Sequence, residues 1–365
     1  MAGFGANMCR ADNRVVNLFR IFLIAGYASL AWNASAQSTE SAPSPPQRSV
    51  HTQITAPDPE NPAQANAQPS SAARTVEIPL LDCAGLPCIE MSTGSGKTLK
   101  LAIDTGEVNS YLDTKVAQSL ELELKPLKGA SDSSIAEVET TVVPGAKLGD
   151  LAMGDFPFMT LDTNQPDKAG QKPEPFPADG VLTYRAFQNR LLQLDYARHL
   201  VRVSEPQDAA QPCPHACSDL VVKHVGAYGP ATLTASGFSI NGIAVDAQVD
   251  TMFTGSMLVY PPSVEKLGLK KAAKSKHKEL FPYVENGIKL ARFDGSSENF
   301  RDIPLASDGP LYFFTADDHP PAVPFDVTVG SGLLQHAVVT LDFKGMHLWM
   351  DTPGSGAPGS NAPQL

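Results

Sequence analysis

Two aspartates are the residues of this sequence whose surroundings best suit chemistry. Asp104 follows a short apolar run typical of a strand and precedes Thr105, and Asp250 stands in the same setting before Thr251. A carboxylate beside a tight turn at the end of a strand can be held by backbone N–H groups. Two such carboxylates about 3 Å apart cannot both ionise, so they share one proton. The ionised one can take a proton from a bridging water while the other donates to a carbonyl oxygen, which hydrolyses an amide without a metal.

An internal repeat strengthens this interpretation. A lone Asp-Thr-Gly, completed in the first case by Gly106, is expected about once in a dozen chains of this length and is usually a surface turn. Here, three segments of the first half recur in the same order in the second half, at an offset of 146 or 147 residues. They are Ala102–Thr105 with Gln248–Thr251, Val181–Thr183 with Thr328–Gly330, and Leu191–Tyr196 with Val338–Phe343. The repeat predicts two copies of one unit.

The two copies are predicted to span residues 76–205 and 218–350, with residues 206–217 as the connection. Short apolar runs broken by Gly, Pro, Asp and Asn dominate both copies, which is typical of β-structure. Helical periodicity is confined to two short candidates, Lys115–Leu122 and Ser263–Leu269. The fold is therefore predicted to be mostly β. If the copies pack about a pseudo-twofold axis, Asp104 and Asp250 meet at that axis.

On these residues the sequence resembles the aspartic peptidases of the retropepsin and pepsin type. The resemblance is carried by Leu101–Gly106, Asp179–Leu182 and Leu191–Tyr196 in the first copy, and by Val249–Ser256, Val329–Gly330 and Val338–Phe343 in the second. It implies a bilobal acid-protease fold, with two tandem retropepsin-like β-barrel halves related by a pseudo-twofold axis. It also implies a peptide cleft covered by a hairpin flap, which would come from about Lys128–Val142.

The same resemblance implies an aspartic endopeptidase with Asp104 and Asp250 as its catalytic residues. The residues that would support them are Thr105, Gly106, Thr251 and Thr254. Such an enzyme acts on a peptide or protein substrate, needs no metal or other cofactor, and here would be a monomer built as a pseudo-dimer.

The sequence also departs from the family pattern. Lobe two has Met252 where a glycine is expected, and a side chain there could occupy the space that the bridging water needs. Lobe one has Glu107 and Val108 where small and hydroxyl-bearing residues are expected, and Thr183 where the second motif ends in glycine. Loss of one orienting hydrogen bond costs about 1–3 kcal/mol. A catalytically impaired peptide-binding protein on the same scaffold is therefore the alternative prediction.

The ends of the chain predict export. Three arginines precede the apolar run Ile21–Trp32 and an Ala-Ser-Ala site, so residues 1–36 are predicted to be a cleaved signal peptide. The run is too short to span a bilayer of about 30 Å, and no stable membrane span is expected once it is removed. Residues 37–75, with seven prolines at 37–74, and the tail 351–365 are predicted to be disordered. The location is expected to be periplasmic or extracellular.

The net charge and the cysteines limit which classes of protein the chain can belong to. The formal net charge is −11 with no basic stripe, which excludes a nucleic-acid binder that relies on phosphate contacts. Four cysteines remain after the signal peptide, and the close pairs Cys83 with Cys88 and Cys213 with Cys217 are the expected disulfides. A metal site at Cys213–Cys217 is less favoured, since no second cluster of ligands matches it. The stretch Gly94–Thr98 lacks the leading glycine of a phosphate-binding loop and is predicted to be a hairpin turn, with Asn241-Gly242 as its counterpart.

Overall fold

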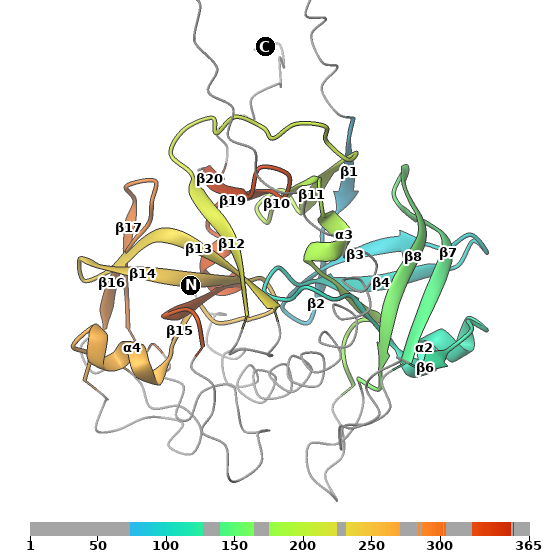
Figure 1. Cartoon of the computed structure of the whole chain (residues 1–365), viewed down its shortest axis with the longest axis horizontal. Coiled ribbons are helices and arrows are strands. Elements are labelled where there is room, and N and C mark those ends of the chain that lie inside the picture. The colour runs from blue at the N-terminus through green and yellow to red at the C-terminus, as the bar shows by residue number, and fades with distance from the viewer. Residues whose placement is uncertain are drawn as a thin grey trace, which may run out of the picture.

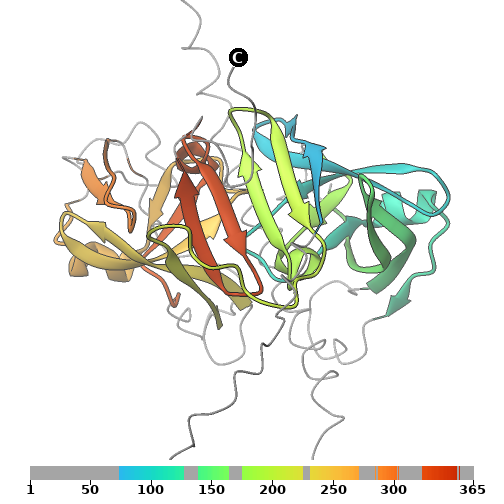
Figure 2. The same cartoon turned by 90° about the horizontal axis from the view of Figure 1, so that it is seen from above.

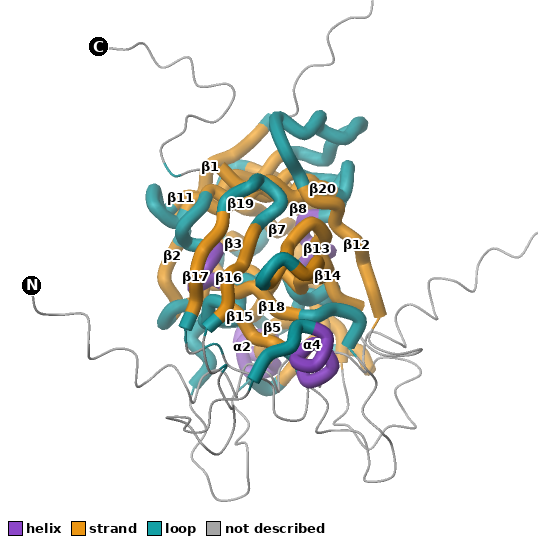
Figure 3. Tube along the Cα trace, turned by 90° about the vertical axis from the view of Figure 1, so that its left-hand side faces the viewer, coloured by secondary structure: helices purple, strands orange, loops and turns teal. Residues whose placement is uncertain are grey.

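The computed structural model describes residues 74–126, 139–163, 175–224, 231–270, 284, 287–301, 303, 323–351 and 353. The predicted signal peptide, almost all of the predicted linker and tail, and residues 128–138 of the predicted flap lie outside this range. Strands make up most of the described chain, and its helices are short (Figure 3). The predicted class, a mostly β fold in two lobes, is confirmed (Figure 1).

Lobe one is formed by the elements from β1 to β11. Its strands are β1 (Thr75–Pro79), β2 (Leu81–Cys83), β3 (Leu86–Ser92), β4 (Thr98–Ile103), β5 (Tyr111–Asp113), β6 (Lys125–Pro126), β7 (Glu139–Leu148), β8 (Leu151–Leu161), β9 (Gly180–Leu182), β10 (Leu191–Asp195) and β11 (Leu200–Ser204). Its helices are α2 (Thr114–Ser119) and α3 (Tyr184–Phe187). The middle strands form one sheet in the order β2-β3-β4-β9-β5-β8-β7-β6.

Lobe two is formed by the elements from β12 to β20. Its strands are β12 (Ser218–His224), β13 (Ala231–Ile240), β14 (Ile243–Asp250), β15 (Met257–Val259), β16 (Ile288–Ala291), β17 (Ser297–Phe300), β18 (Val327–Gly330), β19 (Val338–Asp342) and β20 (His347–Asp351). Its helices are α4 (Pro261–Lys266) and α5 (Ser331–Leu334). The two predicted helices are present as α2 and α4, with ends that differ by one to three residues from those expected, and the short helices α3 and α5 were not predicted.

The two lobes share one order of elements around each aspartate. In lobe one, β4 pairs in parallel with β9, and β5 pairs antiparallel with β9. In lobe two, β14 pairs in parallel with β18, and β15 pairs antiparallel with β18. A short helix follows each of β5, β9, β15 and β18, and α2 and α4 lie on the outer sides of the two lobes (Figure 1). The duplication read from the sequence is therefore present in the topology.

The last two strands of each lobe join the lobes into one body. Strand β10 pairs antiparallel with β19 from Leu191↔Asp342 to Asp195↔Val338, so the repeated segments lie against each other (Figure 2). β11 and β1 continue the sheet on one side, and β20 and β12 continue it on the other. At the centre, the Gln193 side-chain amide donates to the Thr340 hydroxyl at 2.9 Å. This symmetric sheet fixes how the two lobes face each other.

The two predicted hairpin turns, one in each lobe, are confirmed. The stretch at Gly94–Lys97 links β3 to β4, and the Thr93 N–H donates to Lys97 O at 2.8 Å. Asn241 and Gly242 link β13 to β14 with φ angles of 50° and 83°. Positive φ at both central positions is the conformation that Asn-Gly favours in a two-residue hairpin.

Both predicted disulfides are present, with sulfur–sulfur distances of 2.13 Å for Cys83–Cys88 and 2.00 Å for Cys213–Cys217. The second pair lies in the connection between the lobes. Its sulfurs and a nitrogen of His347 lie within 4.8 Å of one another. Because metal binding needs free thiolates and these sulfurs are bonded together, the disulfide interpretation holds. Within the described residues, no helix is long and apolar enough to cross a membrane.

Candidate active site

The two aspartates lie at equivalent points of the two lobes. Asp104 directly follows β4, and its N–H donates to Leu182 O of the parallel neighbour β9 at 2.8 Å. Asp250 is the last residue of β14, which lies beside β18. Asp104 is 3% exposed and Asp250 is 5% exposed. Each carboxyl group is therefore presented by a strand end that the core holds in place.

Thr105 and Thr251 connect the two strand ends across the lobe boundary. The Thr105 hydroxyl donates to Val249 O at 2.8 Å, and the Thr251 hydroxyl donates to Ile103 O at 2.6 Å. Each hydroxyl oxygen also accepts the N–H of the other threonine, at 3.2 and 3.3 Å. Both threonines are almost fully buried. These reciprocal hydrogen bonds hold Asp104 and Asp250 as neighbours at the junction of the lobes.

Main-chain donors orient the two carboxyl groups in matching ways. The Gly106 N–H donates to Asp104 Oδ1 at 2.8 Å. In lobe two, Asp250 Oδ1 accepts the N–H groups of Met252 and Phe253, both at 2.9 Å. The donor expected from a glycine in lobe two is thus supplied by Met252, because it belongs to the main chain and not to the side chain.

Gly106 packs closely against the other aspartate. A Cβ atom at this position would lie 3.0 Å from Asp250 Cγ and 3.1 Å from Asp250 Cβ, a separation that real Cβ atoms rarely show. The absence of a side chain therefore lets the loop after Asp104 approach Asp250 directly. This observation also places the two aspartate loops in contact.

The carbonyl group of Gly106 ends a buried polar chain from lobe two. It accepts hydrogen bonds from the Thr232 hydroxyl at 2.9 Å and from Gln248 Nε2 at 3.4 Å. The Gln248 amide also donates to the Thr232 hydroxyl at 2.8 Å and accepts from Thr328 at 2.7 Å. Thr328 in turn shares a hydrogen bond of 2.9 Å with the Tyr260 hydroxyl. Lobe two thus fixes the loop of lobe one by polar contacts.

The surroundings of the pair raise the pKa of both carboxyl groups. Burial, together with the charges of Asp250 and Glu107, holds the pKa of Asp104 well above its usual value of 3.8. Burial raises the pKa of Asp250 from 3.8 to about 6, against the N–H groups of Phe253 and Met252, which lower it. Because the two groups interact, their protons are released as from one pair. At mildly acidic pH the pair can therefore hold a single proton.

These raised pKa values predict how stability varies with pH. Between pH about 4 and 6, Asp250 is ionised in the unfolded chain and still protonated in the folded one. The free energy of unfolding therefore decreases as pH rises through this range. Replacing the group removes this loss. We expect Asp250→Asn to be more stable than wild type at pH 7 by about 1–3 kcal/mol, and the difference to vanish near pH 4. Urea unfolding at both pH values measures it, and a difference that does not change with pH would contradict the raised pKa.

A third carboxyl group, Glu107, lies beside the pair. It is 5% exposed, and burial together with the charge of Asp250 raises its pKa well above 4.5, against the Val108 N–H. Its main chain is fixed from both lobes, by a β-bridge to Thr232 and by the Tyr184 N–H, which donates to Glu107 O at 3.2 Å. In the sequence this residue stood out only as a departure from a motif. Its position directly after Asp-Thr-Gly was the signal that could have shown a further acid.

Met252 is accommodated by lobe one. In the alignment of the two repeats, Ala102 and Val181 of lobe one are equivalent to the polar residues Gln248 and Thr328 of lobe two. Met252 is fully buried in an apolar cluster that contains both of these small residues. The other buried members of the cluster are Cys83, Leu86, Cys88, Tyr111, Met159 and Ala178. The side chain that was expected to enter the space between the carboxyl groups is therefore part of the packing between the lobes.

This packing makes Met252 a stabilising residue. We expect Met252→Ala to lower the free energy of unfolding by about 2–5 kcal/mol, because it leaves a cavity in the cluster. Met252→Leu, which nearly preserves the volume, is expected to cost less than about 1.5 kcal/mol. Urea unfolding of the two variants and of wild type makes the comparison. Equal stability of Met252→Ala and wild type would show that the side chain does not pack as described.

Thr254 and Thr183, the remaining residues singled out by the sequence, make their contacts away from the two carboxyl groups. Thr254 is only partly buried, and its Cγ2 faces Gly85; no hydrogen bond joins it to Asp250 within the described residues. Thr183 has a local function, since its hydroxyl donates to Val108 O at 2.6 Å and lies 3.2 Å from the Ser110 hydroxyl. Val108 and Thr183, which both depart from the family pattern, are thus joined by a hydrogen bond.

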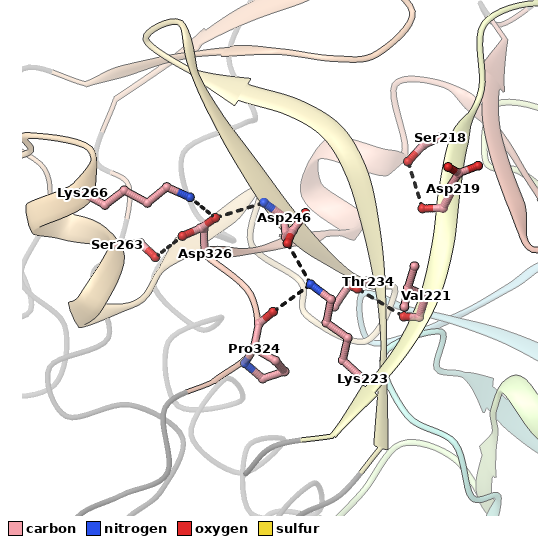
Figure 4. A network of polar contacts seen from close by, with 10 residues as sticks. All are labelled: Ser218, Asp219, Val221, Lys223, Thr234, Asp246, Ser263, Lys266, Pro324 and Asp326. Atoms are coloured by element: carbon pink, nitrogen blue, oxygen red, sulfur yellow. Dashed lines mark hydrogen bonds and ion pairs between the residues drawn. The ribbon is translucent and has the colours of Figure 1, made fainter. Parts of the chain in front are cut away.

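A second aspartate in each lobe accepts a hydrogen bond from the strand that leads to Asp104 or Asp250. In lobe one, Asp179 Oδ2 accepts the Lys100 N–H at 2.8 Å. The equivalent residue in lobe two is Asp326, whose carboxyl group accepts the Asp246 N–H at 3.0 Å (Figure 4). Lys266 also donates to Asp326 at 2.7 Å. Burial opposes ionisation of Asp326, but these donors outweigh it and lower its pKa. This aspartate is ionised and structural, unlike the pair at the lobe junction.

Comparison with known proteins adds little at the level of sequence. No family model matches the chain, and no curated protein matches it. An aspartic proteinase from Irpex lacteus matches in structure with a TM-score of 0.43 and 11% identity, over 79% of this chain and 100% of that one. Basic 7S globulin from soybean matches with a TM-score of 0.42 and 10% identity, over 77% of this chain and 96% of that one. Neither match distinguishes a retropepsin-type from a pepsin-type relative.

The architecture is defined by the strand pairing described above. The chain is a duplicated, bilobal β-protein in which each lobe contributes one Asp-Thr to a common junction. This is the architecture that the resemblance to aspartic peptidases implied.

Proposed function

We propose that this chain is an exported aspartic endopeptidase that hydrolyses peptide bonds with a water activated between Asp104 and Asp250. The observation that carries the proposal is the set of reciprocal hydrogen bonds between Thr105 and Thr251, which makes neighbours of two buried aspartates from different lobes. Two buried carboxyl groups that share a proton provide a base and an acid in one place.

The chemistry follows from that single shared proton. The ionised aspartate takes a proton from water, and the resulting hydroxide adds to the carbonyl carbon of the peptide. The protonated aspartate gives its proton to the carbonyl oxygen, which forms a neutral tetrahedral intermediate. When the C–N bond breaks, the protonated aspartate gives its proton to the nitrogen and the ionised aspartate takes a proton from a hydroxyl of the intermediate. The products are a carboxylic acid and an amine, and the pair again holds one proton. Main-chain N–H groups hold one oxygen of each carboxyl group throughout.

Other parts of the proposal concern the setting of the enzyme. Two disulfides are compatible with an oxidising compartment outside the cytoplasm. One chain supplies both aspartates, so a monomer that is built as a pseudo-dimer is sufficient. The proposed substrate is an unfolded or extended stretch of peptide or protein.

The test is hydrolysis of an unfolded protein substrate by the chain without its first 36 residues, from acid to neutral pH. Asp104→Asn is the matched control, since it keeps the size of the side chain and removes its ionisation. Cleavage by wild type and not by the control supports the proposal. The absence of cleavage at every pH, by a protein shown to be folded, would reject it.

A peptide-binding protein without activity is the second candidate, and Glu107 is the feature that favours it. If Glu107 were ionised, a second negative charge beside Asp104 and Asp250 would disfavour the singly ionised state that the chemistry needs. In that case the wild-type chain would bind peptides, measured by fluorescence polarisation of a labelled peptide library, and leave them intact.

A further inference from the structure

Glu107 is held at the lobe junction so that one of its oxygens has no hydrogen-bond partner. Its backbone is bridged to Thr232 of lobe two and accepts the N–H of Tyr184 from α3. The Val108 N–H donates to its carboxyl group. The oxygen Oε2 is buried and has no hydrogen-bond partner within the described residues. Since buried polar atoms are nearly always paired, this oxygen requires an explanation.

The groups around Glu107 do not favour its ionised form. The ends of β4 and β14 bring the carboxyl groups of Asp104 and Asp250, both of which interact with it. From α3, the main-chain N–H of Tyr184 donates to the main-chain carbonyl of Glu107 and leaves its carboxyl group without a further donor among the described residues. An ionised oxygen that is buried beside two acids and without a donor would be very costly. A protonated oxygen is instead a donor, and the carboxyl groups of Asp104 and Asp250, which interact with Glu107, can accept from it.

We propose that Glu107 acts as a neutral carboxylic acid that donates its Oε2 proton to the Asp104–Asp250 pair, directly or through one water, as a positioning residue. The inference rests on the proposed function and extends it. The donated hydrogen bond takes the place of the hydroxyl that the family resemblance led us to expect in this loop. A neutral Glu107 adds no second negative charge beside the pair, so the singly ionised state that the chemistry needs is preserved.

Two variants of similar size separate a donor from a charge. Glu107→Gln keeps a side-chain donor and is neutral, whereas Glu107→Leu keeps most of the volume and has no donor. We expect kcat/KM of Glu107→Gln to stay within about threefold of wild type at the pH optimum. For Glu107→Leu we expect a loss of about 10- to 100-fold, mainly in kcat, as one buried hydrogen bond would give. Equal losses in both variants would indicate an ionised group at work, and no loss in either would indicate no role; both results overturn the proposal.

A second measurement does not depend on activity. In protein with carbon-13 at the glutamate carboxyl groups, the NMR signal of Glu107 is identified by its absence from Glu107→Gln. We expect it to keep the chemical shift of a protonated acid up to pH 7. A signal that titrates near the ordinary glutamate value of about 4.3 would overturn the proposal, even in a protein that cleaves its substrate. An inactive wild type would reject the proposed function, and the titration would then decide the state of Glu107 alone.

Discussion

Asp104→Asn and Asp250→Asn are each expected to lower kcat/KM for peptide hydrolysis by a factor of about 10³ or more. The chemistry needs one carboxylate and one carboxylic acid, and an asparagine at either place can neither accept the proton of water nor pass it on. General acid–base catalysis by a positioned group contributes about 10²- to 10⁴-fold, and here each aspartate serves as acid and base in turn. Because the pair works as a unit, the double variant is expected to be little slower than either single one.

Two controls separate this loss from a loss of folding. Each asparagine variant replaces a buried carboxyl group, whose ionisation is costly, with a neutral amide. Both variants are therefore expected to be at least as stable as wild type at pH 7. Asp246 lies in the same strand as Asp250, β14, and its carboxylate accepts a hydrogen bond from Lys223 away from the junction (Figure 4). Asp246→Asn is therefore expected to keep full turnover. If wild type and both single variants turned over substrate equally fast, Asp104 and Asp250 would not be the catalytic pair.

Thr105→Val together with Thr251→Val is expected to lower the free energy of unfolding by about 3–6 kcal/mol. The double change keeps the volume and removes all the reciprocal hydrogen bonds, which leaves Val249 O and Ile103 O without their donors. A buried polar group that loses its partner costs about 1–3 kcal/mol. We also expect kcat to fall at least tenfold, because the two carboxyl groups lose the contact that sets their separation. Urea unfolding and steady-state kinetics measure the two effects.

The serine variants Thr105→Ser and Thr251→Ser provide the matched control. They keep the hydroxyl and lose one methyl group, so we expect most of the stability and activity to remain. A double-mutant cycle with the valine changes should give a coupling of about 1–2 kcal/mol, since each threonine bonds the N–H of the other. Additive effects of the two valine changes would mean that the threonines do not act together across the lobe boundary.

The sequence predicted the parts of the site that are local to each half. Asp104 and Asp250 were found because the same apolar strand and the same turn precede and follow each of them, and strand–turn patterns are visible in a short window of residues. The disulfides could be predicted for the same reason, since each joins cysteines only a few residues apart. The duplication then indicated that equivalent strands of the two halves would be arranged alike.

The sequence did not predict how unlike the two halves are where they meet. Met252 was interpreted as an obstruction, whereas its side chain packs among residues of lobe one that lie up to 169 positions before it in the chain. Glu107 was interpreted only as a departure at a position where a small residue is expected, whereas the structure makes it a buried acid beside the pair. Asp326 was not singled out at all, although it repeats Asp179 at the common offset of 147 residues.

By itself, the sequence determined a duplicated β-protein with one Asp-Thr turn in each half, because hydrophobic alternation and turn residues act over a few neighbouring positions. Only the tertiary structure decided that Thr105 and Thr251 exchange hydrogen bonds, that Met252 packs among residues of lobe one and that Glu107 is buried beside two other acids. These contacts join residues far apart in the chain, and burial sets their strength. The low-dielectric interior raises the pKa of each carboxyl group, so the protonation state of the site depends on the packing of the lobes and on no single stretch of residues.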